Sequence, residues 1–94
     1  MSDFLEQAAA GLGERISDFD GTAKFAVEGV GAIMLNSDGA RIADEDADVT
    51  LSAEADTFQA IFSGELNPTS AFMTGKLTID GDMGMAMKLA SALA

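Results

Sequence analysis

The chain has 94 residues, of which 48% are hydrophobic and 22% charged, a composition typical of a folded domain rather than a disordered segment. Cysteine, histidine, tyrosine and tryptophan are absent, which excludes disulfides, thiolate nucleophiles and the commonest transition-metal ligands, so the composition argues against an enzyme. The formal net charge of −11 disfavours nucleic acid and anionic membranes as partners, and its simplest role is solubility.

Residues 1–94 are expected to form a single domain, because the chain has one proline, no Pro-rich or Ser-rich linker and no internal repeat. Its uninterrupted apolar runs are much shorter than the roughly 20 residues of a membrane helix, so we expect no stable membrane insertion. The first residues, MSDFLEQAAAGLGERI, lack the basic and apolar regions of a signal peptide. A cytoplasmic location is therefore predicted.

The amino-terminal segment has the apolar spacing of a helix. Its apolar positions are Phe4, Leu5, Ala8, Ala9, Leu12 and Ile16. Asp3 and Glu6 could form a capping box at the start of this helix. Gly11 and Gly13 are poor helix formers, so we expect the second half of the helix to be weak.

Three segments in the middle of the chain alternate apolar and polar side chains, as strands with one buried face do. They are residues 24–28, 32–36 and 48–52. The sequence EGVG between the first two predicts a tight hairpin, and NSDG predicts a second turn that leads into a short strand at residues 40–43.

A helical pattern returns in SAEADTFQAIFSG, which places Ala55, Phe58, Ile61 and Phe62 on one face and ends at Gly64. The sequence ELNPTSAF is expected to form a Pro-bearing turn, GKLTID a strand, and Asp82 the cap of a last helix. The predicted order is helix, four strands, helix, strand, helix. This order predicts an α+β fold, a five-stranded, mostly antiparallel sheet covered on one face by helices.

The sequence DFDGT at residues 18–22 matches the nucleophile loop of haloacid dehalogenase-type phosphatases, in which one aspartate is phosphorylated. That loop follows a buried apolar strand, whereas ERIS precedes it here, and the fold that carries it is much longer. An Asp-Gly turn leading into the first strand accounts better for these residues.

The densest acidic stretch, DEDAD at residues 44–48, suggests calcium. An EF-hand loop starting at Asp44 would need glycine at its sixth position and glutamate at its twelfth, but Val49 and Ala55 stand there. A solvated loop before a strand is the simpler interpretation. We predict no metal and no cofactor.

Four of the six methionines lie near the carboxyl terminus, and thioethers could bind copper(I). On a helix, however, Met83 and Met87 share one flank while Met85 lies about 160° away, and no cysteine or histidine assists them. The same helix has an apolar arc wider than it needs to pack on a sheet, with a spine of small and branched residues between methionine flanks. The spine is Ala86, Leu89, Ala90 and Leu93.

This surplus of adaptable apolar surface either fills the core or lines a cavity for an apolar ligand. The neighbouring segments add Phe58, Phe62, Phe72 and Met73, with no polar residue expected to be buried among them. Such a lining would bind by apolar burial, worth about 25 cal/mol per Å².

Residues 58–89, FQAIFSGELNPTSAFMTGKLTIDGDMGMAMKL, resemble the carboxyl-terminal signature of the sterol carrier protein type 2 domain, a lipid-transfer family. The resemblance includes the Gly-x-Leu-Asn-Pro turn, Ser-Ala-Phe, Gly-Lys-Leu and Gly-Asp-Met-Gly, and DADVTL at residues 46–51 extends it. It implies a helix, a five-stranded sheet with a crossover helix, and carboxyl-terminal helices that close an apolar tunnel for sterols, fatty acids, acyl-CoA or phospholipids.

From this resemblance we expect a non-catalytic, intracellular protein that binds and transfers a fatty acyl or sterol-like lipid. The residues predicted to line the tunnel, with the first two as its floor, are Ile33, Leu35, Phe58, Phe62, Phe72, Met73, Met83 and Met87. Two alternatives stay open. One is a protein-interaction module of the same fold with a filled core, and the other is an accessory domain of a separately encoded lipid-modifying enzyme.

Overall fold

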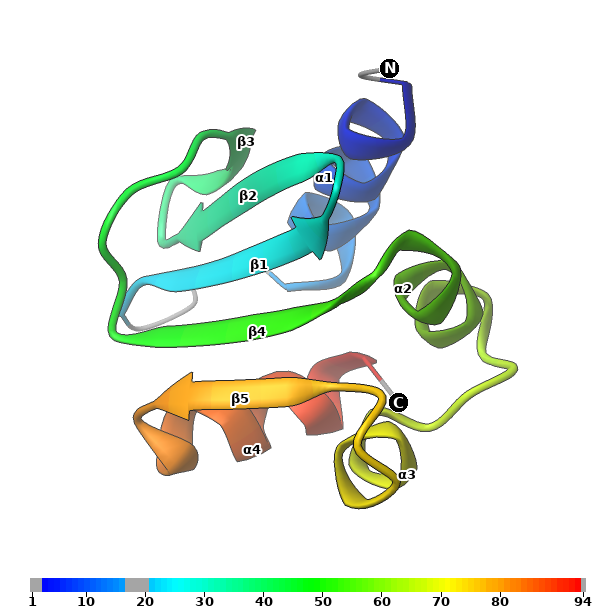
Figure 1. The fold of residues 1–94 in the computed structure, drawn as a ribbon. Helices are drawn as coiled ribbons and strands as arrows, with labels where there is room; N and C mark the ends of the chain where they lie inside the picture. Colours follow the sequence, from blue (N-terminus) through cyan, green and yellow to red (C-terminus); the bar gives the residue numbers. More distant parts are fainter. Residues whose placement is uncertain (1–2, 17–20, 94) are drawn as a thin grey trace.

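In the residues that the structure describes, the chain folds as a helix, four strands, two helices, a strand and a last helix (Figure 1). The computed structural model describes residues 3–16 and 21–93. The elements are α1 (Asp3–Arg15), β1 (Ala23–Glu28), β2 (Gly31–Asn36), β3 (Gly39–Ile42), β4 (Val49–Glu54), α2 (Ala55–Ser63), α3 (Pro68–Met73), β5 (Thr78–Gly81) and α4 (Met83–Leu93). The predicted α+β class is confirmed. The predicted order lacked α3, which stands where a Pro-bearing turn was expected.

The five strands form one sheet in the order β3-β2-β1-β4-β5. The pairs β1–β2, β2–β3 and β4–β5 are antiparallel, whereas β1 and β4 run parallel, with Phe25 opposite Leu51. The sheet is therefore mixed, and the prediction of a mostly antiparallel sheet holds for three of its four pairings. The parallel pairing arises because the chain crosses from the edge strand β3 to the far side of β1 before it forms β4.

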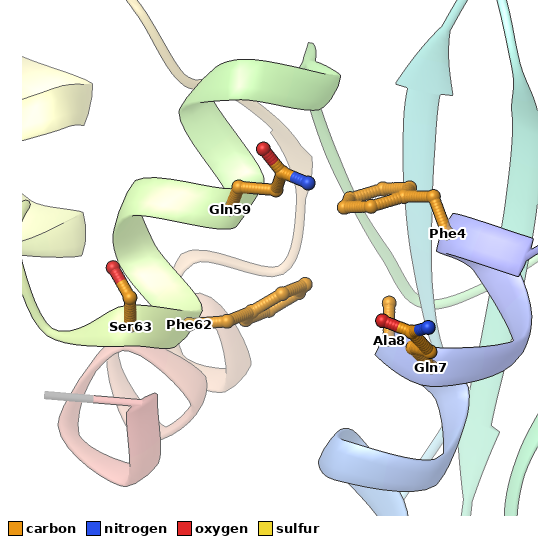
Figure 2. Close-up of a pocket in the computed structure, with 6 residues that line it drawn as sticks. All are labelled: Phe4, Gln7, Ala8, Gln59, Phe62 and Ser63. Carbon is orange, nitrogen blue, oxygen red and sulfur yellow. The ribbon is translucent and has the colours of Figure 1, made fainter.

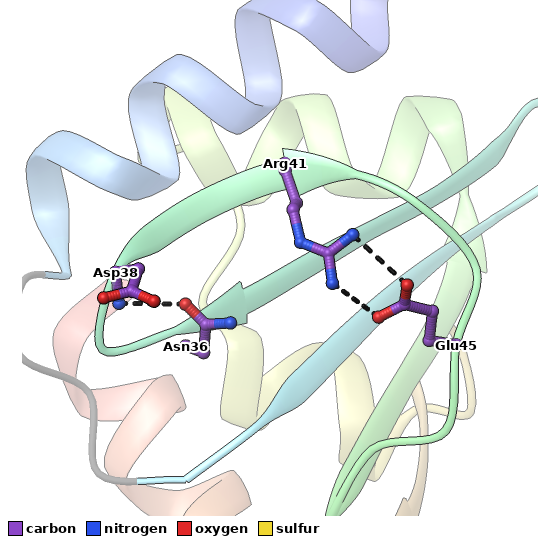
Figure 3. A network of polar contacts seen from close by, with 4 residues as sticks. All are labelled: Asn36, Asp38, Arg41 and Glu45. Carbon is purple, nitrogen blue, oxygen red and sulfur yellow. Dashed lines mark hydrogen bonds and ion pairs between the residues drawn. The ribbon is translucent and has the colours of Figure 1, made fainter.

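Both predicted hairpin turns are confirmed. The first turn lies between β1 and β2, where Gly29 has a φ of 77° and the Val30 N–H donates to the Val27 carbonyl over 3.0 Å. In the second turn the Asp38 N–H donates to Oδ1 of Asn36 over 2.9 Å (Figure 3). These bonds fix the register of β1, β2 and β3, which places alternate side chains on the same face of the sheet.

The hydrophobic core lies on one face of the sheet, under the helices. Helix α1 packs over β2 and β3, α2 over β1 and β4, and α4 over β4 and β5. Alternate strand residues point into this layer and are fully buried, among them Phe25, Ile33, Leu35, Val49 and Leu51. The prediction that helices cover one face of the sheet is confirmed by this arrangement.

The loop between β3 and β4 crosses the opposite face of the sheet (Figure 3). Lys24 Nζ pairs with Asp44 Oδ1 over 2.9 Å, and the two outer nitrogens of Arg41 bond both carboxylate oxygens of Glu45. The hydrogen bonds to Glu45 and the negative charge of that carboxylate raise the pKa of Arg41. Met34, which lies beside Lys24 in the sheet register, is buried on this face.

Capping residues mark one end of each of the helices α2, α3 and α4. Gly64, in the left-handed region with φ 87°, ends α2, and the Met85 N–H donates to Asp82 Oδ1 over 3.1 Å at the start of α4. Both caps were predicted. The unpredicted helix α3 begins after Asn67, whose Oδ1 accepts from the Thr69 N–H over 2.8 Å, with Pro68 in its first turn.

Helix α1 continues through Gly11 and Gly13 to Arg15, so the expected weakness of its second half does not interrupt it. Leu12, between the two glycines, is buried against the sheet and helps to hold this turn in place. The Asp3 side chain of the predicted capping box and residues 17–20, which include most of the DFDGT sequence, lie outside the described residues.

Candidate functional site

A pocket of about 270 Å³ opens between α1 and α2 on the helical face of the sheet. Its lining residues come from two helices far apart in the sequence. They are Phe4, Gln7 and Ala8 from α1 and Gln59, Phe62 and Ser63 from α2. Figure 2 shows the ring of Phe4 extending toward α2 and the ring of Phe62 extending toward α1, so the two rings face the space between the helices.

The pocket exists because α1 and α2 pack over different halves of the sheet. Phe4 and Ala8 are four residues apart and therefore lie on the same face of α1, as Gln59 and Ser63 do on α2. Ala8 is buried, Phe4 and Phe62 are half-buried, and the three polar residues are exposed. The site thus has apolar walls and a polar rim.

Three aromatic rings connect the sheet to this pocket. Phe25 of β1 meets Phe58 of α2 edge to face, with ring centroids 6.1 Å apart, and Phe58 stacks on Phe62 with centroids 5.8 Å apart. Phe25 and Phe58 are fully buried, whereas Phe62 is the member that reaches the pocket. The inner rings hold α2 on the sheet, and the outer ring forms a wall of the site.

The rim carries amide and hydroxyl groups but no ionisable side chain. Gln7, Gln59 and Ser63 each offer both a hydrogen-bond donor and an acceptor. An adjoining groove on the outer flank of α2 shares Gln59 and Ser63 with the pocket and adds Asp56 and Glu65. The surroundings of the pocket mouth on the α2 side are therefore acidic.

The eight residues predicted to line a lipid tunnel fall into three places. Ile33, Leu35 and Phe58 are fully buried in the core, and Phe62 lines the pocket between α1 and α2. The other four, which are Phe72, Met73, Met83 and Met87, have exposed side chains on α3 and α4. The role of these eight residues in lipid binding, and the tunnel itself, stay predictions.

Helix α4 has the buried spine and the two methionine flanks that the sequence predicted. Its spine of Ala86, Leu89, Ala90 and Leu93 is buried. On one flank Met85 is half-buried and its methyl group lies against Gly21, while on the other Met83 is 46% and Met87 54% exposed. The surplus apolar surface of this helix is thus covered on one flank and open on the other.

Five residues of the pocket were not predicted from the sequence: Phe4, Gln7, Ala8, Gln59 and Ser63. Phe4 and Ala8 belonged to the predicted core face of the first helix, and this face extends to the pocket. The available signal for α2 was the pair Gln59 and Ser63, which forms a polar flank beside the apolar face of Phe58 and Phe62.

No group of three or more acidic side chains in residues 3–16 and 21–93 is placed to hold a metal ion. In the same part of the chain, no helix is long and apolar enough to cross a membrane.

A helical layer covers one face of a mixed five-stranded sheet, and an apolar-walled pocket opens between two of its helices. These features define a small α+β domain. The model of the SCP-2 sterol transfer family matches residues 2–94. The chain belongs to this family.

Curated relatives match part of the chain. Hydroxysteroid dehydrogenase-like protein 2 of Danio rerio is 54% identical over 48 residues, which are 51% of this chain and 12% of that protein. Sterol carrier protein 2 of Homo sapiens is 44% identical over 61 residues, which are 65% of this chain and 10% of that protein. The chain therefore spans about a tenth of the length of these relatives.

Solved structures share the fold at low sequence identity. Sterol Carrier Protein-2 of Aedes aegypti, determined in complex with the C16 fatty acid palmitate, has a TM-score of 0.81 at 22% identity, with coverage of 100% of this chain and 97% of that one. The sec-alkylsulfatase Pisa1 of a Pseudomonas species has a TM-score of 0.69 at 21% identity, and the match covers 95% of this chain but 15% of that one. The same fold thus occurs as a small protein and as part of a large enzyme.

Proposed function

We propose that this protein binds a lipid with a single apolar tail in the pocket between α1 and α2, and that it carries the lipid without chemical change inside the cell. The observation that carries the proposal is the arrangement of the pocket, with Phe4, Ala8 and Phe62 as apolar walls and three amide or hydroxyl side chains at the mouth. Binding would remove the tail from water, while the rim would bond the head group.

The size of the pocket limits the ligand. Its volume of about 270 Å³ is slightly below the roughly 300–1,000 Å³ of typical small-molecule sites. One slim tail suits this space better than two tails or a bulky ring system. The family match and the palmitate complex of the Aedes aegypti protein support a lipid ligand of this kind.

The test replaces a small side chain in the pocket wall with a larger one, so the pocket narrows and no existing side chain is shortened. Native mass spectrometry would detect lipid that stays bound on purification, and displacement of the uncharged probe N-phenylnaphthylamine would report binding. Ala8→Leu narrows the pocket and should weaken probe binding severalfold, while Ala92→Leu, at an exposed position of α4, should leave it unchanged. Urea unfolding of both variants would show that they still fold.

A second candidate function is that of an interaction or accessory module with the same fold. It is favoured by the complete burial of Ile33, Leu35 and Phe58, residues predicted to line a tunnel but packed among other side chains. If no lipid copurifies and the probe does not bind, this second function would account for the protein better.

A further inference from the structure

The charges around the pocket suggest which head group it accepts. The three polar side chains that line its mouth, Gln7, Gln59 and Ser63, are neutral. Each can donate and accept a hydrogen bond, so together they match a head group that also does both, such as a hydroxyl or a primary amide. A carboxylate or phosphate only accepts, and binds best where a cationic side chain faces it.

The ionisable groups that line the adjoining groove on the α2 side of the mouth are acidic. Asp56 and Glu65 line the groove that shares Gln59 and Ser63 with the pocket. Asp56, Gln59 and Ser63 are spaced three and four residues apart and lie on one flank of α2. An anionic head group at this rim would therefore sit beside like charges.

The described cationic side chains lie elsewhere. Lys24 and Arg41 pair with Asp44 and Glu45, in the region of the loop that crosses the opposite face of the sheet (Figure 3). Lys76 lies between α3 and β5, and Lys88 lies on α4, and neither lines the pocket or its adjoining groove. None of these four cationic side chains is thus positioned to balance an anion in the pocket.

We propose, building on the lipid-binding function proposed above, that the pocket between α1 and α2 selects single-tailed lipids with an uncharged hydroxyl or amide head group over fatty-acid anions. The neutral rim hydrogen-bonds the head group, and the carboxylates of Asp56 and Glu65 repel a negative one. The selectivity is electrostatic, so it is strongest at low ionic strength.

The test uses ligands with the same tail. Dodecanamide, dodecanol and dodecanoate compete with N-phenylnaphthylamine bound to the full chain. The amide and the alcohol are kept below their solubility limits and dodecanoate below its micellar concentration, at a pH where dodecanoate is ionised. At low salt the amide and the alcohol should displace the probe at roughly tenfold lower concentration than the carboxylate, and high salt should reduce this ratio. Equal displacement by all three ligands at low salt would overturn the selectivity and leave lipid binding intact.

A matched pair of variants separates a local effect from that of net charge. Glu65→Lys, in the groove that adjoins the rim, should improve displacement by dodecanoate severalfold and leave displacement by dodecanamide unchanged. Asp80→Lys makes the same charge change on the opposite face of the sheet, where Asp80 pairs with Thr50, and should have little effect. Equal gains in the two variants would refute a rim-based selectivity. If none of the three ligands displaces the probe in any form of the protein, lipid binding in this pocket fails, and the selectivity fails with it.

Discussion

The ring of Phe62 stacks on the ring of Phe58, with centroids 5.8 Å apart and planes inclined by 22°. Phe58 is fully buried and also meets Phe25 edge to face, whereas Phe62 is half-buried and lines the pocket. Neighbouring turns of α2 thus provide one aromatic ring for the core and one for the candidate site. This pair allows stability and ligand binding to be separated by mutation.

Phe58→Ala should destabilise the fold by about 3–5 kcal/mol, the usual cost of removing a fully buried aromatic ring. Phe62→Ala should cost less, about 1–2 kcal/mol, because part of its ring already faces the pocket, but it should weaken probe binding severalfold. Urea unfolding and probe displacement would measure the two effects. An equally large loss of stability in Phe62→Ala, with binding unaltered, would instead point to a filled core.

Met87 tests the part of the predicted lipid site that lies on α4. The side chain is 54% exposed and is not part of the lining of the pocket between α1 and α2. Met87→Gln should therefore change the free energy of unfolding by no more than about 0.5 kcal/mol and leave probe displacement unchanged. Leu89→Ala, in the buried spine of the same helix, is the contrasting variant and should cost about 2–5 kcal/mol. Weaker lipid binding by Met87→Gln would support the role that the sequence predicted for this residue.

The boundaries of most elements were predictable because local chemistry determines them. Gly64 ends α2, Asp82 caps α4, and Gly29 lies in the first hairpin turn, each through backbone geometry or a bond to a nearby residue. Helix α3 was missed because its six residues are too few to show a periodic pattern, although Asn67 and Pro68 form a good helix start. The parallel pairing of β1 with β4 was missed because alternation shows which face a residue occupies but not which strand lies beside it.

The candidate site was harder to predict than the fold. Phe62 was identified from its apolar helical face, but the pocket also needs Phe4 and Gln7, more than 50 residues earlier in the chain. The pocket depends on the distance between α1 and α2 across the sheet, and that distance is a tertiary property without a local sequence signal. The buried spine of α4 was predicted, whereas the open flank of Met83 and Met87 depends on what packs beside the helix.

The start of α3 depends on one amide side chain. Asn67 Oδ1 accepts from the Thr69 N–H over 2.8 Å and from the Ser70 N–H over 3.4 Å. Asn67→Ala should therefore destabilise the protein by about 1 kcal/mol. Asn67→Asp keeps an acceptor at the same position and should be nearly neutral. Thermal or urea unfolding would compare them, and equal stability of the alanine and aspartate variants would show that the cap contributes nothing.

Gly81 and Gly64 both have positive φ angles, 108° and 87°, but their surroundings differ. A Cβ at Gly81 would overlap the carbonyl oxygen of Asp48 and lie 3.0 Å from the Val49 Cα, whereas a Cβ at Gly64 would meet nothing within 4 Å. Gly64→Ala should thus cost about 1 kcal/mol, the conformational penalty alone, and Gly81→Ala about 3 kcal/mol or more. The larger loss arises because β5 must move away from β4, which also breaks the 3.0 Å bond from the Asp82 N–H to the Asp48 carbonyl. Urea unfolding of the two variants, together with hydrogen exchange at Asp82, would measure this difference, and equal costs would contradict the close approach of β5 to Asp48.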